Sequence, residues 1–314
     1  MTTTMSPPPA APTPDEPTAD EMENWIGARP TGPRRRAANL AASIWMIGSV
    51  VVALVPLGFI AFHVVAKGIS VISWSFLTKD LPVISNLPGG GIWPAIAGTL
   101  LLTGAAAAMA VPLGVLAAIY LNEYGGQGAT ARVIRFMADV MTGVPSIVMG
   151  LFVALIWVSA GVHAGFSTFA GALALACLML PIVIRTSEEM LKLVPDDLRR
   201  ASDAVGARRS QTVTRVVLPA ALPGIVSGAM LAVARAAGET APLLFTIGIS
   251  RAFNPSLGAQ NTALPKEIWN NAQQPFPASQ DRAWGAALTL ITIVFVLTVI
   301  ARIVSARFAT KTNG

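Results

Sequence analysis

Charged side chains are scarce in this sequence. Asp, Glu, Lys and Arg make up 12% of the 314 residues, whereas a soluble globular domain carries roughly 25%. Hydrophobic residues make up 54%. The charge-free runs reach the length of about 20 residues that a helix needs to cross a hydrocarbon core of about 30 Å. Short segments of alternating hydrophobicity, which are typical of transmembrane barrels, are missing. The composition therefore predicts an all-α, polytopic membrane protein.

Cysteine and several catalytic motifs are also missing or nearly so. Cys177 is the single cysteine, so no intramolecular disulfide can form, and no Cys or His cluster with metal-ligand spacing surrounds it. The sequence contains no Gly-x-x-x-x-Gly-Lys phosphate loop, no His-Glu-x-x-His and no Gly-x-Ser-x-Gly. These absences predict a non-catalytic chain that binds no metal and no cofactor itself.

Six apolar runs predict six membrane-spanning helices, and their boundaries are near 40–65, 93–121, 137–160, 166–184, 222–247 and 283–304. Among the prolines inside these runs are Pro56, Pro112, Pro145 and Pro242. Because proline removes a helical hydrogen bond, we expect a kink at each of them.

The basic residues predict the orientation of these helices. With the N-terminus inside, the inner segments hold 16 of the 22 Lys and Arg residues and the outer segments hold five, while Arg235 lies within a run. This asymmetry places both termini in the cytoplasm, and it explains the net charge of +6 without a nucleic-acid partner. The predicted organisation is a disordered, proline-rich cytoplasmic tail at 1–38, a transmembrane domain at 39–307 with an inner loop at 185–221 and an outer loop at 248–282, and a cytoplasmic tail at 308–314.

Arg235 is the first candidate site residue because it lies near the midpoint of the predicted span 222–247. An ionised side chain at mid-bilayer costs about 2.5–3.5 kcal/mol and usually marks a functional position. Glu239 follows four residues later, on the same face of a helix. The planar guanidinium of arginine suits oxyanions. The hypothesis is an anion path that Arg235 lines, with Glu239 preventing tight binding; the alternative is a buried ion pair that only fixes helix packing.

The inner loop contains the second candidate site. Its string DDLRRASDAVGA at 196–207 and VVLP at 216–219 resembles the EAA loop by which permeases of ATP-binding-cassette importers dock on their ATPase. In that comparison Arg200 and Ser202 replace the Glu and the second Ala. The resemblance assigns docking to residues within these two strings: Asp197, Ala201, Asp203, Gly206, Leu218 and Pro219. The alternative is an amphipathic helix on the lipid surface.

Four strings make the resemblance more specific: AIYLNEY at 118–124, GVPSIVMG at 143–150, DAVGA at 203–207 and ARAAGETAPLLFT at 234–246. Together they resemble the PstA-type permease family of bacterial phosphate importers. The resemblance implies a type I importer fold in the cytoplasmic membrane and makes Arg235 and Glu239 lining charges of the path. Ser146 and Thr240 are then possible hydroxyl donors, although such hydroxyls more often bond to backbone.

The same resemblance implies several partners: a PstC-type permease that forms a heterodimer with this chain, an ATPase dimer that holds ATP and Mg, an extracytoplasmic phosphate-binding protein, and membrane lipid. Two alternatives stay open. The cargo could be sulfate, molybdate or phosphonate, or the chain could be a channel or secondary transporter, although no internal inverted repeat is visible. Glu123 and Asp139 are expected to be solvated charges near the inner ends of spans.

Overall fold

The computed structural model describes residues 33–84, 86–159 and 165–311. Within these residues every regular element is a helix. The chain divides into two units, Met1–Ala61 and Phe62–Gly314, which are described separately. The first contains most of α2 (Pro33–Gly68), a 36-residue apolar helix with Pro56 inside it. Residues 33–38, predicted to belong to the disordered tail, are the start of this helix. The rest of that predicted tail lies outside the described residues.

The second unit continues from the end of α2 through helices of very different length. In chain order these are α3 (Trp74–Thr78), α4 (Trp93–Ile119), the π-helix η1 (Tyr120–Tyr124), α5 (Ala129–Gly143), α6 (Ser146–Val153), the π-helix η2 (Ala154–Ser159), α7 (Thr168–Lys192), α8 (Asp196–Ala204), α9 (Arg209–Thr212), the π-helix η3 (Val213–Val217), α10 (Leu218–Ala237), α11 (Ala241–Thr246), α12 (Leu264–Ala272) and α13 (Pro277–Lys311).

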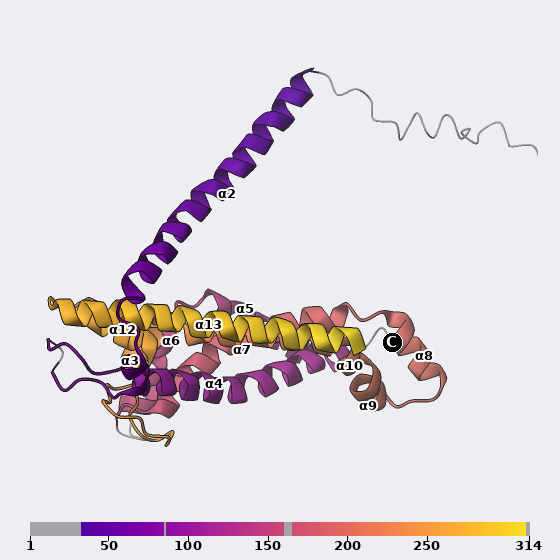
Figure 1. Ribbon diagram of the computed structural model, residues 1–314. Coiled ribbons are helices and arrows are strands. Elements are labelled where there is room, and N and C mark those ends of the chain that lie inside the picture. The colour runs from indigo at the N-terminus through magenta and orange to yellow at the C-terminus, as the bar shows by residue number, and fades with distance from the viewer. Residues whose placement is uncertain (1–32, 85, 160–164, 312–314) are drawn as a thin grey trace, which may run out of the picture. The chain divides into compact units, whose positions relative to one another are not determined.

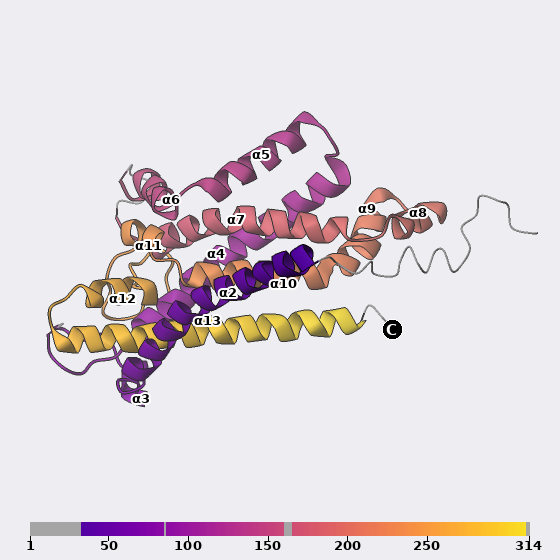
Figure 2. The ribbon, with the colours of Figure 1, turned by 90° about the horizontal axis from the view of Figure 1, so that it is seen from above.

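The core of this unit is the packing of α4 against α7, with α10 between α7 and α13 (Figure 2). The α4–α7 contact is rich in alanine, including Ala106, Ala110 and Ala172, which are all buried. Gly114 of α4 lies so close to Val183 of α7 that an added Cβ would approach the valine Cγ1 to 2.7 Å. Small residues allow the two backbones to approach closely, which is how membrane helices associate in the absence of a hydrophobic driving force.

Five helices of the described residues are long and apolar enough to cross a membrane, and the count is six if one bent pair is a single span. The predicted span at 137–160 bends at Pro145, where a kink was expected, but the bend is a complete break of the helix. The span consists of α5 and the continuous segment α6–η2, which meet at an angle of 107°. Val144 and Pro145 lie between them in extended conformations. Proline disfavours a helical residue before it and cannot donate a helical hydrogen bond, so the helix stops here.

The predicted span at 222–247 also needs correction. Helix α10 ends at Ala237, and a separate short helix, α11, begins at Ala241 with Pro242 in its first turn. Pro242 thus starts a new helix and does not kink a continuous one, because a proline at the first positions of a helix loses no hydrogen bond. Consequently Arg235 lies in the last turn of α10, and not at the midpoint of a long span.

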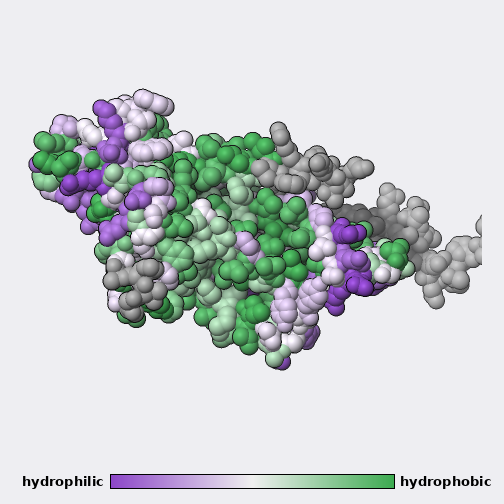
Figure 3. Space-filling view, turned by 90° about the horizontal axis from the view of Figure 1, so that it is seen from below, coloured by the Kyte–Doolittle hydropathy of each residue, from purple (hydrophilic) through white to green (hydrophobic). Residues whose placement is uncertain are grey.

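Polar side chains gather at the two ends of the second unit, with an apolar belt between them (Figure 3). Helices α8 and α9 lie at one end, and α3 and α12 lie at the other (Figures 1 and 2). The two long loops predicted at 185–221 and 248–282 are thus at opposite ends. The inner loop is largely helical, since α7 extends to Lys192 before α8, whereas the outer loop contains α12 and the start of α13 within longer irregular stretches. The predicted C-terminal tail begins inside α13, which continues to Lys311.

Candidate functional site

Arg235 and Glu239 form a loose ion pair across the end of α10. Arg235 Nε lies 3.8 Å from Glu239 Oε1, a separation longer than a hydrogen bond. Glu239 follows Gly238, the C-cap of the helix, so the two residues do not belong to one continuous helix. The Arg235 side chain is 70% exposed and that of Glu239 is 23% exposed. Most of the guanidinium is therefore available to another group, and its position in the last helical turn is favourable for a cation.

Arg235 belongs to an exposed stripe along α10. Ser227, Leu231, Arg235 and Gly238 are exposed, and they follow one another at helical spacings of four, four and three residues. The opposite side of the same helix is buried and consists of small residues, among them Ala232 and Ala236. The stripe therefore faces away from the core of this chain, toward a surface that a neighbouring protein or lipid must cover.

The structure brings two of the recognised strings into contact. Helix α6 carries the end of the string at 143–150, and α11 carries the end of the string at 234–246. The two helices pack together. The contact is backbone to backbone: a Cβ added at Gly150 would lie 2.5 Å from Pro242 Cα. Only glycine fits at such a distance. The break after α10 and the bend before α6 are thus joined by one tight contact.

Ser146 and Thr240 begin the two helices of this contact. Ser146 is the first residue of α6, one turn before Gly150, and Thr240 is the N-cap residue of α11. Within the described residues neither hydroxyl has a hydrogen bond, so neither is bonded to nearby backbone. Other hydroxyls in these helices do bond that way; Thr246 Oγ1, for example, donates to the Pro242 carbonyl at 2.8 Å. The structure shows no contact that links Ser146 to Arg235.

The segment expected to dock on an ATPase forms α8, a turn, α9 and η3. Helix α8 follows Pro195 and has Asp197 in its first turn, where a carboxylate is favourable. After the helix, Gly206 adopts a φ of +79°, which is left-handed backbone that favours glycine. The Gly206 amide donates to the Asp203 carbonyl at 2.9 Å. Asp197, Ala201, Asp203 and Gly206 are all exposed.

Leu218 and Pro219 differ from the other residues predicted to dock. Both belong to the first turn of α10. Leu218 packs against a buried cluster that includes Val217 and Ile225, whereas Pro219 is exposed. Leu218 is thus part of the attachment of the docking segment to the body of the protein, while the exposed residues of α8 form its outer surface.

Two acidic residues expected to be solvated are in fact paired. Glu123 is 5% exposed, and its Oε1 accepts a hydrogen bond of 3.1 Å from Arg199 of α8, so the expectation for Glu123 is wrong. Asp139 is exposed but forms an ion pair with Arg185 of α7. The Glu123–Arg199 pair joins residues 76 positions apart, which explains why local spacing gave no sign of it.

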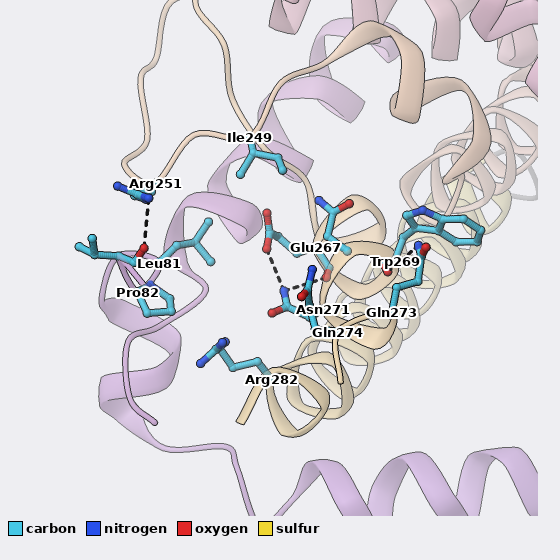
Figure 4. A pocket seen from close by; sticks show the side chains of 12 residues that line it. Leu81, Pro82, Ile249, Arg251, Glu267, Trp269, Asn271, Gln273, Gln274 and Arg282 are labelled. Carbon is cyan, nitrogen blue, oxygen red and sulfur yellow. Dashed lines mark hydrogen bonds between the residues drawn. The ribbon is translucent and has the colours of Figure 1, made fainter. Parts of the chain in front are cut away.

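A polar cavity of about 470 Å³ lies at the end of the unit that contains α12, and neither Arg235 nor Glu239 lines it (Figure 4). Glu267 of α12 lines this cavity and accepts hydrogen bonds from Thr262 Oγ1 at 2.7 Å and Asn271 Nδ2 at 3.0 Å. Burial raises the pKa of Glu267, and burial lowers the pKa of the neighbouring Lys266, whose ammonium donates to the Ile247 carbonyl. These contacts fix α12 and the chain after α11.

A family model that covers more than half of the chain defines the class of this protein as an inner-membrane permease component of binding-protein-dependent transport systems. Residues 110–313 match the family model described as "Binding-protein-dependent transport system inner membrane component". A solved inward-facing structure of the MetNI methionine transporter superposes with a TM-score of 0.55 at 21% identity and covers 69% of this chain and 94% of the other. The crystal structure of a bacterial transporter involved in the import of alginate superposes with a TM-score of 0.57 at 13% identity. It covers 87% of this chain and 99% of the other. These likenesses establish the fold alone.

The sequence relatives are more specific. "Phosphate transport system permease protein PstA 1" of Mycobacterium tuberculosis H37Rv is 44% identical over 286 residues, covering 88% of this chain and 90% of the relative. PstA of Mycobacterium leprae is 44% identical over 282 residues, covering 88% and 91%. PstA of Yersinia pestis is 42% identical over 273 residues, covering 87% and 92%. The chain belongs to the PstA family of inner-membrane permease subunits, which confirms the family, the type I importer fold and the location predicted from the sequence.

Proposed function

We propose that this chain carries inorganic phosphate inward across the cytoplasmic membrane, driven by ATP hydrolysis on a separate subunit that holds the ATP and Mg. The observation that carries the proposal is the 44% identity, over 88% of the chain, to a permease named for phosphate transport. The exposed guanidinium of Arg235 supports it, because a fork of parallel donors suits a tetrahedral oxyanion.

The arrangement at the end of α10 supports a specific role for each residue of the pair. Arg235 meets the anion, and Glu239 competes with the anion for the same guanidinium, since the carboxylate is already 3.8 Å from Arg235 Nε. Competition of this kind keeps the anion from being held too tightly to leave. Ser146 and Thr240 serve as neutral donors in this proposal, because their hydroxyls have no hydrogen-bonding partner within the described residues. An ion pair that only fixed packing would be buried, whereas the Arg235 side chain is 70% exposed.

The exposed surfaces support the proposed partners. A PstC-type permease covers the exposed stripe of α10 and forms the other wall of the path. One subunit of an ATPase dimer docks on α8, whose residues are all exposed or partly exposed. An extracytoplasmic phosphate-binding protein delivers the anion at the opposite end, near α12, and lipid surrounds the apolar belt of Figure 3.

Uptake of labelled phosphate by the reconstituted complex tests the cargo and the energy source together. Excess unlabelled phosphate is expected to abolish uptake of the label, whereas equal concentrations of sulfate, molybdate or phosphonate leave it nearly unchanged. Inhibition by sulfate equal to that by phosphate would replace phosphate with a broader oxyanion cargo. Concentrative uptake that continued without ATP would instead indicate a secondary transporter.

Gly206→Arg tests the docking segment. The substitution forces a side chain into left-handed backbone at φ +79°, which costs roughly 1–2 kcal/mol, and adds a long cation to the exposed turn after α8. We expect phosphate uptake to fall at least about fivefold and ATP hydrolysis to lose its stimulation by the binding protein. Gly89→Arg is the matched control, because Gly89 also has a positive φ, +100°, with open space around it, but lies outside the docking segment. Equal losses in both variants would indicate general damage and not docking.

A further inference from the structure

A partly buried ion pair joins the docking segment to η1, the π-helical turn at the end of α4. Arg199 of α8 donates from Nη2 to Glu123 Oε1 at 3.1 Å and to the Leu191 carbonyl at 2.9 Å. Its Nη1 donates to the Val194 carbonyl at 2.6 Å. One guanidinium therefore connects three elements: α8 on which it lies, the last turn of α7, and η1.

A second contact joins the docking segment to the same turn. The guanidinium carbon of Arg209, the first residue of α9, lies 5.4 Å from the centroid of the Tyr124 ring, within the range of a cation–π interaction. Both helices of the docking segment, α8 and α9, therefore contact η1, through Arg199 and Arg209 respectively.

The other side of η1 is held by α5. Arg135 donates from Nη2 to the Leu121 carbonyl at 3.0 Å and from Nη1 to the Gly126 carbonyl at 3.2 Å. Its Nε donates at 2.9 Å to Glu188, a buried carboxylate of α7. The five-residue turn thus contacts the docking segment on one side and α5 on the other. Helix α5 continues through the bend at Pro145 into α6.

The attachment of α8 depends strongly on Arg199. No residue of α8 is buried, and its apolar side chain Leu198 and the following Val205 are 44% and 84% exposed. The hydrophobic packing that fixes a helix to a protein body is therefore weak here. Glu123 is nearly inaccessible to solvent, and a buried carboxylate without its cation is strongly unfavourable. The pair consequently resists separation more than the rest of the α8 surface does.

We propose that Arg199 and Glu123 are positioning residues that make the docking segment and the inner end of α4 move as one body, and that Arg135 passes this movement to α5. The inference rests on the proposed ATP-driven function, since it names the route by which closure of the ATPase reaches the helices around the path.

A distance measurement that needs no phosphate tests the proposal directly. With Cys177 replaced by alanine the chain has no other thiol, so spin labels can be placed at Tyr120 of η1 and Leu198 of α8, which are both exposed. In the assembled complex we expect the same narrow distance distribution without nucleotide and with ADP trapped by vanadate after ATP hydrolysis. Arg199→Gln is expected to broaden it. If Arg199 and Glu123 are intact and the distance between the two labels still changes during the ATPase cycle, the proposal is overturned.

A chemical rescue tests whether the link itself matters for transport. In the same Cys177→Ala background, Glu123→Cys combined with Arg199→Cys is expected to lower phosphate uptake per ATP hydrolysed about tenfold. A short bifunctional thiol reagent that joins the two cysteines should restore most of it. The proposal would be contradicted if cross-linking abolished the remaining uptake. It would also be contradicted if the double-cysteine variant had a normal ratio of uptake to ATP hydrolysis before cross-linking. Arg132→Gln, which removes an exposed arginine of α5, is the control and should leave coupling unchanged.

These measurements separate the inference from the proposed function. Absence of ATP-driven phosphate uptake in the unaltered complex would refute the function, whereas the distance between η1 and α8 can still be measured in that complex. Normal uptake together with a changing distance would refute the link alone.

Discussion

Replacing Arg235 with glutamine is expected to reduce phosphate uptake to below about a tenth of normal, with assembly and basal ATP hydrolysis retained. A hydrogen bond to a charged group contributes about 1.5–3 kcal/mol, and each 1.4 kcal/mol corresponds to a factor of ten. The side chain is 70% exposed and has only a loose contact to Glu239, so its loss leaves the fold of this chain nearly undisturbed. Uptake into proteoliposomes, measured beside ATP hydrolysis, checks the expectation.

Three companion variants sharpen this experiment. Arg235→Lys keeps the charge and loses the planar fork, so we expect an intermediate uptake rate with a raised KM. Glu239→Gln removes the competitor for the guanidinium, so we expect a lowered KM together with a lowered maximal rate. Arg302→Gln, which removes an exposed arginine of α13, should have no effect. Normal uptake by Arg235→Gln at normal protein level would exclude Arg235 from the path.

The apolar runs predicted where the helices lie but not where they break. Hydropathy cannot detect the end of α10 at Ala237, because α11 (APLLFT) consists mostly of apolar residues and continues the apolar run. Proline is also ambiguous in this respect. Pro112 lies inside the continuous helix α4, whereas Pro145 lies at a bend of 107°. The two prolines differ in the backbone conformation of the preceding residue and in the packing of α6 on α11. Neither feature can be read from the position of a proline in the sequence.

The candidate site was predictable to the extent that its contacts are local in sequence. Arg235 and Glu239 are four residues apart, and helical spacing alone suggested that they could pair. Glu123 and Arg199 are 76 residues apart, and Glu123 looked like a solvated charge at the end of a span. Only the fold places α8 beside the end of α4. The exposure of Arg235, which distinguishes a lining residue from a packing residue, likewise depends on how α10 faces its neighbours.

Replacing Gly150 with leucine is expected to have the second large effect, because it separates α6 from α11. Any Cβ at this position would lie 2.5 Å from Pro242 Cα and 2.9 Å from the Pro242 carbonyl oxygen. Both are backbone atoms of a helix start and cannot rotate away, so the helices must move apart. Overpacking of this kind costs about 1–3 kcal/mol or more. We expect uptake to fall at least about tenfold and the melting temperature of the complex to fall by several degrees.

The glycines of the same string provide the control for that loss. Gly143 ends α5, and a Cβ there meets nothing within 4 Å, so Gly143→Leu should keep most of the uptake. Gly150→Ala introduces only the clashing Cβ and should produce a partial loss with the complex still assembled by size-exclusion chromatography. If Gly150→Leu transported phosphate normally, the close contact of α6 with α11 would not be needed for transport. The break after Arg235 would then be positioned by α10 alone, and the two strings at 143–150 and 234–246 would act independently of each other.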